Sequence, residues 1–425
     1  MLNRLGKYDL LKVLGQGASS TVYLACDPFA QREVAIKVAT PEILSDPERG
    51  KLYSRLFLNE ASLVGKLNHP HIVQIYDAVV AENACYIVME YVPGGTLEAF
   101  AQVGHLLPLE RVVEIIFKCT RALDFAFRLG ITHRDIKPAN ILLAGEFDVK
   151  ISDFGTAIAH GVDCTQVSGV GSPAYMSPQQ VQERPLDHRT DIYSLGVVMF
   201  QLLTGQLPFQ ASSNYNMVYQ IINTQPVKPS FLRSDIPAVL DDIVARAMAK
   251  ELEERYPDWE QFGADLAMAV RLPHLKVQKG DFADAEKFAM LRSLAFFSIF
   301  SDVELWESLR FAQWSHVAPG TVIMRDGEPG DFFCFVASGE LKITKNGKML
   351  NVLTVGDCFG EMAVINRQGQ TRGADVTALT AADIITINGE ALNAASESCR
   401  MHFYQGFLDV LAGRLAVANQ RLAAF

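Results

Sequence analysis

The side chains best placed for chemistry lie in one eight-residue run and in a triplet that follows it. Residues 133–140 read His-Arg-Asp-Ile-Lys-Pro-Ala-Asn, and Asp153 opens an Asp-Phe-Gly triplet. Metal ions and positioning carry most of the burden in phosphoryl transfer, so a few carboxylates and amides can do much of the work. Asp135 could accept the proton of an attacking hydroxyl, while Asn140 and Asp153 hold magnesium. The order and spacing of these residues predict phosphoryl transfer to a hydroxyl group.

A glycine-rich turn and a lysine further upstream could hold the phosphates. Residues 8–14 and 22–25 alternate apolar and polar side chains, which predicts two strands around Gly15 and Gly17. Glycine has no Cβ and lets a backbone close over phosphates, although many hairpins carry such a turn. Lys37 follows in the apolar run Val-Ala-Ile-Lys, where an unpaired ammonium would be costly. It therefore needs anions, such as phosphates and a carboxylate.

Glu60 is the best candidate for that carboxylate. It lies in residues 56–67, where apolar side chains recur three and four apart, as in a packed helix. Together these motifs resemble the bacterial Hanks-type Ser/Thr protein kinases over residues 8–272. The resemblance implies an α+β two-lobed protein kinase fold, with a small lobe at residues 8–92 and a large lobe at residues 93–272. It also implies an enzyme that uses ATP and Mg2+ to phosphorylate serine or threonine in a protein substrate.

The resemblance implies roles for single residues. The catalytic positions are Lys37, Glu60, Asp135, Lys137 and Asn140, and the metal ligands are Asn140 and Asp153. The ATP-binding positions are Leu14, Gly15, Gly17, Val22, Ala35, Lys37, Met89, Glu90, Val92, Leu142 and Asp153. Glu90 and Val92 would bind adenine through backbone groups, with Met89 at the back of the pocket.

Two contacts outside the catalytic run are also implied. Asp191 resembles the aspartate on a buried helix that braces the catalytic loop. Gln179 stands where the family usually has a glutamate that pairs with the structural arginine, here Arg255. An amide can still accept a hydrogen bond from a guanidinium, but without charge assistance the contact should be weaker.

Regulation by phosphorylation is a further expectation. In this family an arginine beside the base, here Arg134, often accompanies control of kinase activity by a phosphate on the activation loop, because the phosphate can pair with the positively charged guanidinium. That loop would cover residues 156–170, with Thr165 and Ser168 as candidate acceptors. The alternative is that both are ordinary loop hydroxyls.

A second set of motifs begins well downstream. Residues 318–344 alternate short strands with turns rich in glycine, which suggests a small barrel or jelly roll. The region resembles the cyclic-nucleotide-binding domains of catabolite activators and of protein kinase A regulatory subunits over residues 294–425. This resemblance implies an α+β β-barrel (jelly roll) with flanking helices, preceded by a linker and leading helix at residues 273–293.

The nucleotide site implied by this second resemblance comprises Gly360, Glu361, Met362, Ala363, Arg372, Gly373 and Ala374. Amides at the start of a short helix would face the cyclic phosphate, and Arg372 would neutralise it with a planar fork of donors. Glu361 would accept a hydrogen bond from the ribose 2′-hydroxyl. Gly373 lacks the hydroxyl that cyclic-GMP-selective members often use, which favours cyclic AMP over cyclic GMP. The alternative is a barrel that has lost its ligand and serves for docking.

Length and composition agree with two globular domains. A chain of 425 residues, with 49% hydrophobic and 20% charged residues, is too long for one core. Its net charge of −10 argues against nonspecific nucleic-acid binding. The seven cysteines show no paired spacing, which predicts reduced thiols. We find no signal peptide and no apolar run near the ~20 residues that a membrane span needs, so we expect a cytoplasmic protein without a membrane span.

Residues 403–422 form an apolar-periodic stretch, which we expect to be the closing helix of the barrel rather than a membrane or partner helix. The combined interpretation is a Ser/Thr kinase whose activity is set by a cyclic nucleotide. Two alternatives stay open: a constitutive kinase whose barrel is an inert docking or dimerisation module, and a pseudokinase scaffold. The protein substrate, the oligomeric state and the sign of the regulation also stay open.

Overall fold

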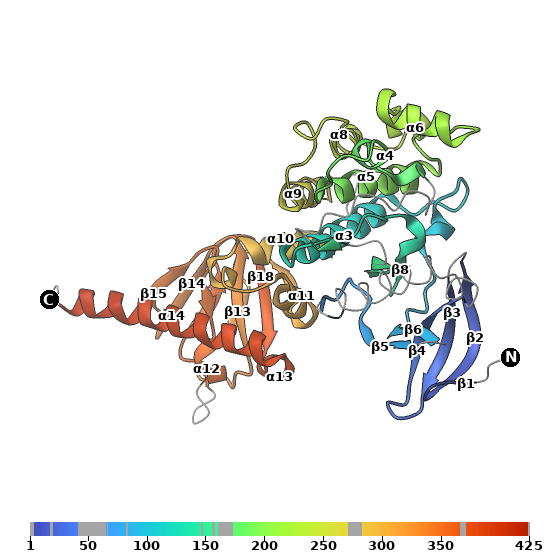
Figure 1. Cartoon of the computed structure of the whole chain (residues 1–425). Coiled ribbons are helices and arrows are strands. Elements are labelled where there is room, and N and C mark those ends of the chain that lie inside the picture. Colours follow the sequence, from blue (N-terminus) through green and yellow to red (C-terminus); the bar gives the residue numbers. More distant parts are fainter. Residues whose placement is uncertain are drawn as a thin grey trace. The chain divides into compact units, whose positions relative to one another are not determined.

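The structure, a computed structural model, describes residues 4–17, 20–40, 65, 67–81, 84–145, 148–154, 158–159, 173–270, 283–365 and 371–423 (Figure 1). The chain divides into two compact units, Met1–Leu275 and Lys276–Phe425. The division falls within residues 273–293, the predicted linker and leading helix.

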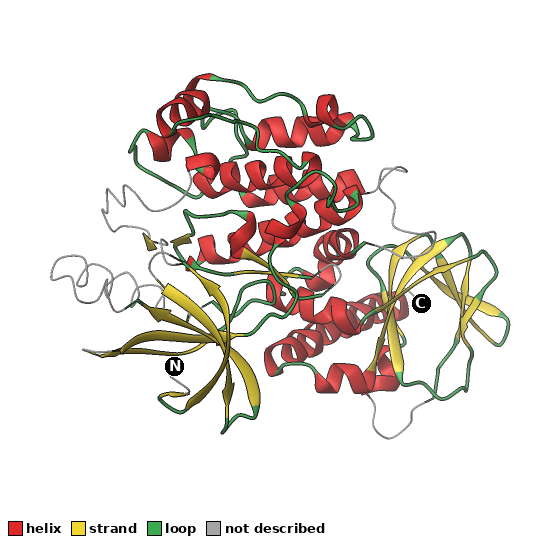
Figure 2. Ribbon diagram, turned by 90° about the vertical axis from the view of Figure 1, so that its right-hand side faces the viewer, coloured by secondary structure: helices red, strands yellow, loops and turns green. Residues whose placement is uncertain are grey.

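Unit 1 begins with a six-stranded antiparallel sheet of order β1-β2-β3-β4-β6-β5 (Figure 2). Its strands are β1 (Arg4–Leu5), β2 (Tyr8–Gln16), β3 (Ser20–Asp27), β4 (Arg32–Ala39), β5 (Ile75–Ala81) and β6 (Ala84–Glu90). β2 and β3 confirm the two strands predicted around the glycine-rich turn. Ala25, Val34 and Ile36 are buried in the core of this sheet, as the alternation of apolar side chains along β3 and β4 requires.

The remainder of unit 1 is mainly helical. Its helices are η1 (Leu97–Phe100), α3 (Leu109–Arg128), η2 (Pro138–Asn140), η4 (Pro173–Tyr175), α4 (Pro178–Val181), α5 (Arg189–Thr204), α6 (Asn214–Asn223), α7 (Pro229–Leu232), α8 (Ala238–Ala247) and α9 (Trp259–Val270). Its short strands are β7 (Ile131–Thr132), β8 (Ile141–Leu143), β9 (Val149–Ile151) and β10 (Ile158–Ala159).

Helix α5 forms the centre of this helical part. Fourteen of its sixteen residues are buried, because apolar side chains occur on all of its faces. Gly196 makes a close approach to α8 possible, since a Cβ there would lie 2.8 Å from the Cβ of Ala247. Asp191, in the first turn of α5, is therefore a carboxylate inside the core. The sheet followed by the helical part confirms the two-lobed α+β fold.

Unit 2 contains two four-stranded antiparallel sheets, β11-β18-β13-β16 and β12-β17-β14-β15. The strands are β11 (Gln313–Val317), β12 (Val322–Met324), β13 (Phe332–Ser338), β14 (Leu341–Lys345), β15 (Lys348–Leu353), β16 (Cys358–Phe359), β17 (Asp375–Ala378) and β18 (Ala382–Asn388). Val336, Leu341 and Val376 belong to the shared core between the sheets. Two packed sheets around one core confirm the predicted jelly roll.

Helices flank this barrel. They are α10 (Asp284–Ser293), η5 (Ala295–Phe297), α11 (Asp302–Phe311), α12 (Glu361–Ile365), α13 (Gly389–Ala394) and α14 (Glu397–Ala423). Phe403 and Phe407 of α14 are buried against Phe296 and Phe333, so α14 is the closing helix that the sequence predicts. Within the described ranges, no helix is both long enough and apolar enough to be a membrane span.

Candidate functional site

The segment after β7 is held by Asp191 of α5. The Asp191 carboxylate accepts hydrogen bonds from the N–H groups of His133 and Arg134, each at 2.7 Å. Burial raises the pKa of Asp191, while these two donors and the His133 ring favour its charged form. Arg134 has a φ of 69°, in the left-handed region that costs a non-glycine residue about 1 kcal/mol or more. The buried helix therefore fixes a strained loop.

The structure brings three of the predicted catalytic residues together. Lys137 Nζ lies 2.7 Å from Asp135 Oδ2, and Asn140 Nδ2 donates to the same oxygen at 3.1 Å and to the Asp135 carbonyl at 2.8 Å. Pro138, the first residue of η2, starts the turn that returns Asn140 toward Asp135. The two donors orient the Asp135 carboxylate, and Oδ1 has no hydrogen-bond partner among the described atoms.

His133 ties this loop to the segment that carries Asp153. Its Nδ1 accepts the Asp135 N–H at 3.2 Å, so Nε2 carries the ring proton and donates to the Ser152 carbonyl at 3.0 Å. The ring also packs on Phe154, with centroids 4.4 Å apart. The imidazole is therefore a structural tie between the two halves of the site.

Lys37 of β4 reaches across to Asp153, and the Nζ–Oδ1 distance is 2.7 Å. The protein around Asp153 disfavours its charge, but the Lys37 ammonium outweighs that effect, and the pKa of Asp153 lies below its usual value. Asp153 has a φ of 62°, also left-handed, and 42% of its side-chain surface is exposed. The carboxylate is thus kept ionised and accessible.

The two predicted metal ligands fit magnesium by their chemistry. Asn140 Nδ2 donates to two acceptors on Asp135, which fixes the orientation of the amide and leaves the Asn140 Oδ1 atom available to bind a metal ion. Asp153 contributes a carboxylate held ionised. Carboxylate and amide oxygens are ligands that Mg2+ prefers, and a magnesium site needs only one or two of them besides phosphates and water.

The strand register places several residues that the sequence predicts to bind ATP on neighbouring strands of the sheet. Val22 of β3 is opposite Gly15 of β2 on one side and Lys37 of β4 on the other. Ala35 is opposite Met89 of β6. These residues therefore form adjacent positions of one sheet, below the glycine-rich turn.

The glycines of this turn are not required by the fold itself. A Cβ on Gly15 would meet nothing within 4 Å, and one on Gly17 would make only an ordinary contact of 3.5 Å. Neither glycine has a positive φ. Open space above a glycine backbone is what a closely approaching phosphate needs.

The other residues that the sequence predicts to bind ATP lie on separate elements. Glu90 is the last residue of β6, and its N–H donates to the Gln74 carbonyl at 2.8 Å. Leu142 lies on β8, paired with Lys150 of β9. Val92 is largely buried just after β6, and Leu14 lies in β2 with a partly exposed side chain.

Three predicted residues lie outside the described part of the chain. They are Glu60 and the candidate phosphoacceptors Thr165 and Ser168. Most of the predicted helix at residues 56–67 also lies there, and its last residue, Leu67, is buried but not helical.

The predicted contact between Gln179 and Arg255 is present. Arg255 Nη2 donates to Gln179 Oε1 at 3.1 Å, and burial lowers the pKa of Arg255 to about 10. The amide also donates from Nε2 to the Lys250 carbonyl at 3.0 Å. A glutamate could not make this second bond, which explains how glutamine serves at this position.

The neighbouring Gln180 is a site residue that the sequence analysis missed. Its Nε2 donates to the Arg134 carbonyl at 2.9 Å, and with Ser177 it forms a capping box at the start of α4. The Ser-x-x-Gln spacing of a capping box was the available signal. Gln180 therefore links the start of α4 to the catalytic loop.

In unit 2, the predicted phosphate-binding arginine is buried but incompletely bonded. Arg372 is 5% exposed, its Nη1 donates to the Gly360 carbonyl at 3.0 Å, and its guanidinium lies 4.3 Å from the centroid of the Phe332 ring. Its Nη2 is buried and has no hydrogen-bond partner among the described atoms. A buried donor of this kind needs an acceptor, and the Nη2 group could supply a hydrogen bond to an anion.

Glycines make room for this guanidinium. A Cβ on Gly330 would lie 2.4 Å from Arg372, and one on Gly360 would lie 2.8 Å from it. Gly360 also has a φ of 79°. Burial lowers the pKa of Arg372, so an added anion would stabilise its charged form. The buried guanidinium, with one donor lacking a partner among the described atoms, thus suits the binding of an anion.

Glu361 has a partner that the sequence analysis did not foresee. This carboxylate is 1% exposed and lies 2.7 Å from Nη1 of Arg414 on α14, which also donates to the Cys358 carbonyl. The two residues are 53 positions apart, so no local pattern could have shown the pair. Of the other predicted residues, Met362 is exposed, Gly373 accepts at its carbonyl from Lys345, and Ala374 adjoins the start of β17.

Two family models match the chain. Residues 8–261, more than half of it, match the protein kinase domain family, and residues 314–399 match the cyclic nucleotide-binding domain family. Both matches agree with the resemblances found in the sequence.

Curated relatives of this chain are named serine/threonine-protein kinases. Serine/threonine-protein kinase PknB of Mycobacterium leprae is 40% identical over 267 residues, which are 61% of this chain and 42% of the relative. PknB of Mycobacterium tuberculosis is 38% identical over 304 residues, 68% of this chain and 47% of the relative. A probable serine/threonine-protein kinase of Clostridium perfringens is 34% identical over 291 residues, 68% and 42% of the two chains. The chain therefore spans less than half the length of these relatives.

Proposed function

Since the chain belongs to the protein kinase family, we propose that it transfers the γ-phosphoryl group of ATP to serine or threonine hydroxyls of a protein. The observation that carries this proposal is the convergence of Lys137 and Asn140 on one carboxylate oxygen of Asp135. The curated relatives that match 61% and 68% of this chain are named serine/threonine-protein kinases, and residues 8–272 are the proposed catalytic domain.

In this mechanism the substrate hydroxyl approaches Asp135. Its oxygen bonds to the γ-phosphorus while the bond from phosphorus to the β–γ bridging oxygen breaks, and Asp135 takes the proton. Lys137, 2.7 Å from Asp135, stays beside the carboxylate and can stabilise the charge of the transferring group. When bound by Asn140 and Asp153, Mg2+ supplies positive charge against the phosphate oxygens. The contact of Lys37 with Asp153 supports a role for Lys37 in binding the phosphates.

The test is autophosphorylation and substrate phosphorylation with labelled ATP. Asp135→Asn removes the proton acceptor and should lower kcat by roughly 100- to 10,000-fold, the usual contribution of general base catalysis. Asp258→Asn, at a partly exposed aspartate of the same unit whose Oδ1 accepts the Gln261 N–H, is the control and should keep full activity. Absence of activity in the parent protein would favour the pseudokinase scaffold.

For unit 2 we propose a cyclic nucleotide as the ligand, with cyclic AMP favoured, and control of the kinase as its effect. The buried Nη2 of Arg372 would bind the cyclic phosphate and Glu361 the ribose 2′-hydroxyl. Gly373, which has no side chain to reach a guanine, supports cyclic AMP. Residues 294–425 are the proposed binding domain, and we place the whole protein in the cytoplasm, where both nucleotides occur.

Two measurements on the full chain distinguish this proposal from its alternative. Calorimetry with cyclic AMP and with cyclic GMP reports binding, and a kinase assay titrated with each reports regulation. Heat of binding together with a change in kinase rate is the expected result. No heat with either nucleotide would leave a constitutive kinase with an inert docking or dimerisation barrel.

A further inference from the structure

A node of three residues joins the six-stranded sheet of unit 1 to the short strand β9. It comprises Gln74, which precedes β5, Glu90, the last residue of β6, and Lys150, in the middle of β9. Glu90 Oε2 accepts the Gln74 N–H at 3.3 Å and lies 3.0 Å from Lys150 Nζ, while the Glu90 N–H donates to the Gln74 carbonyl at 2.8 Å. One carboxylate therefore connects three separate segments of the chain.

The segment that precedes β5 is itself bound to β9. The Ile151 N–H donates to the His71 carbonyl, and the Val73 N–H donates to the Ile151 carbonyl, both at 2.9 Å. Gln74, the next residue, binds both the backbone and the side chain of Glu90. The end of β6 and the strand β9 are thus held against the same segment, and the ion pair of Glu90 closes the ring of contacts.

This ion pair is partly shielded from water. The side chains of Lys150 and Glu90 are 17% and 26% exposed, so solvent and salt screen their attraction less than that of a fully exposed pair. Without Lys150, the Glu90 carboxylate would keep only the N–H of Gln74 among the partners in the described part of the chain. Lys150 is therefore the main charged support of this carboxylate.

On β9, the pair adjoins the metal-binding end of the candidate site. The strand that carries Lys150 leads into Ser152, whose N–H donates to the Asn140 carbonyl at 2.8 Å, and then into Asp153. Asn140 and Asp153 are the two predicted metal ligands. The position of β9 therefore affects where magnesium and the phosphates would be held.

On β6, the pair adjoins the end of the site that is predicted to bind adenine. In the proposed reaction, Glu90 and Val92 bind the adenine of ATP through backbone groups. The nucleotide has limited reach, so the protein must hold its adenine-binding and metal-binding ends at a matching separation. Contacts that set this separation before ATP arrives improve its affinity, because less ordering is left for the binding step.

We propose that Lys150 is a positioning residue for ATP, whose ion pair with Glu90 holds the adenine-binding segment in place relative to β9. This role depends on the proposed function, since it presumes that ATP is the ligand. Adenine is remote from the γ-phosphorus, so contacts with adenine are equally strong in the ground state and in the transition state. Losing them raises KM and leaves kcat unchanged.

The experiment measures nucleotide binding and phosphoryl transfer separately on the full chain. Lys150→Met removes the charge and keeps the length of the side chain. In calorimetry it should weaken binding of a non-hydrolysable ATP analogue with Mg2+ by roughly 5- to 10-fold. The KM for ATP should rise by the same factor, with kcat within about twofold of the parent. Lys150→Arg, which keeps the charge, should restore most of the affinity.

Arg233→Met is the matched control. Arg233 forms an ion pair with Asp235 at 2.8 Å and is 24% exposed, and its described contacts, with Asp235 and the Leu203 carbonyl, lie away from the candidate site. Its loss should leave the ATP affinity and KM unchanged. The thermal unfolding midpoint of each variant shows that it is folded, and Glu90→Gln tests the same pair if Lys150→Met does not fold.

A double variant shows whether the two residues act as a pair. Glu90→Gln should weaken nucleotide binding about as much as Lys150→Met, and the combination should be no weaker than either change alone. Additive losses, or a Lys150→Met chain with the ATP affinity of the parent, would overturn the proposal. A parent that binds ATP but transfers no phosphate would refute the proposed reaction alone, whereas a parent that binds no ATP would overturn both.

Discussion

Replacing Asp191 with asparagine should uncouple the catalytic loop from its buried support. The aspartate accepts two backbone N–H groups at 2.7 Å, and asparagine keeps one acceptor while turning its NH2 group toward the other donor. Hydrogen bonds to charged groups contribute about 1.5–3 kcal/mol, and a buried donor left unpaired costs a similar amount. Removing the buried charge offsets part of this, because burial already raises the pKa of Asp191.

We therefore expect Asp191→Asn to destabilise unit 1 by about 2 kcal/mol, which lowers its thermal midpoint by roughly 4–8 °C. The effect on catalysis should be larger than the loss of folded protein. Arg134 is strained and adjoins Asp135, so losing one support shifts the base, and misplacement by about 1 Å can cost 100-fold in rate. The assay is kcat per folded molecule, with the folded fraction taken from thermal unfolding.

Asp241→Asn provides the matched control. Asp241 of α8 is also buried and accepts two hydrogen bonds from Ser230, at 2.9 and 2.6 Å, but it has no contact with the catalytic loop. It should lose stability while keeping kcat per folded molecule. If Asp191→Asn keeps full activity, or if both variants lose activity equally, Asp191 does not position the loop.

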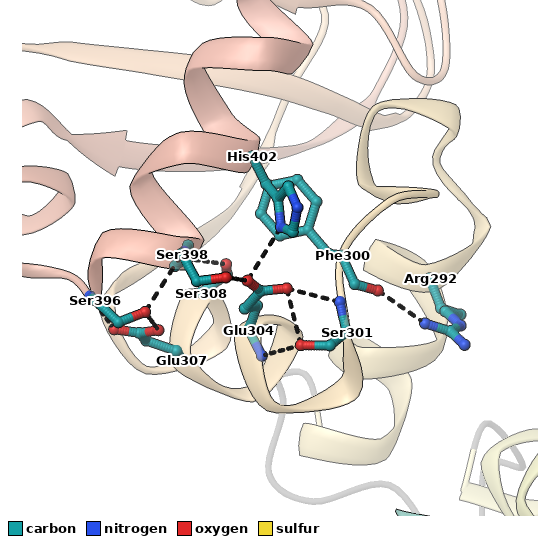
Figure 3. Close-up of polar contacts among 10 residues, drawn as sticks. Arg292, Phe300, Ser301, Glu304, Glu307, Ser308, Ser396, Ser398 and His402 are labelled. Carbon is teal, nitrogen blue, oxygen red and sulfur yellow. Dashed lines mark hydrogen bonds and ion pairs between the residues drawn. The ribbon is translucent and has the colours of Figure 1, made fainter. Parts of the chain in front are cut away.

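Three further predictions concern other contacts. Arg372→Ala should weaken cyclic nucleotide binding by roughly 10- to 100-fold in calorimetry, while the exposed Arg325→Ala should not, and unchanged affinity would show that Arg372 does not hold the phosphate. Glu304 is buried, but hydrogen bonds from serines and the nearby His402 lower the pKa of Glu304 (Figure 3). Glu304 therefore contributes to the free energy of unfolding of unit 2 above the pKa that it has in the unfolded chain, and this contribution is lost as the pH falls through its pKa in the folded protein. Glu304→Gln should make the free energy of unfolding of unit 2 depend less on pH in the acid range. An unchanged pH dependence would contradict the assignment. Gln179→Leu should lower the free energy of unfolding by about 1–3 kcal/mol in denaturant titrations, since it removes an acceptor from Arg255 and a donor to Lys250; a variant as stable as the parent would show that these bonds contribute nothing.

Much of the architecture could be predicted because its signals are local. The alternation of apolar and polar side chains at residues 8–14 and 22–25 predicted β2 and β3, and the apolar periodicity of residues 403–422 predicted most of α14. The grouping of Asp135, Lys137 and Asn140 is also local, since they lie within six positions. Short-range patterns specify such features before any tertiary contact forms.

What the sequence could not predict depends on contacts between distant residues. Gln180 reaches Arg134 across 46 positions, and Arg414 reaches Glu361 across 53. Such pairs are decided by how elements pack, and packing overrides local preference. The apolar periodicity of residues 403–422 was visible in the sequence, but only the structure shows that Phe403 and Phe407 are the side chains that close the barrel.

Arg134 and Asp153, two of the left-handed residues in the described part of the chain, make the geometry of the candidate site conditional on the integrity of the surrounding core. Each would relax to an ordinary backbone geometry as soon as the surrounding core loosened, and the carboxylates of Asp135 and Asp153 would then drift apart. A damaged or half-assembled molecule should thus be inactive, so the proposed transfer reaction would depend on a fully folded unit 1.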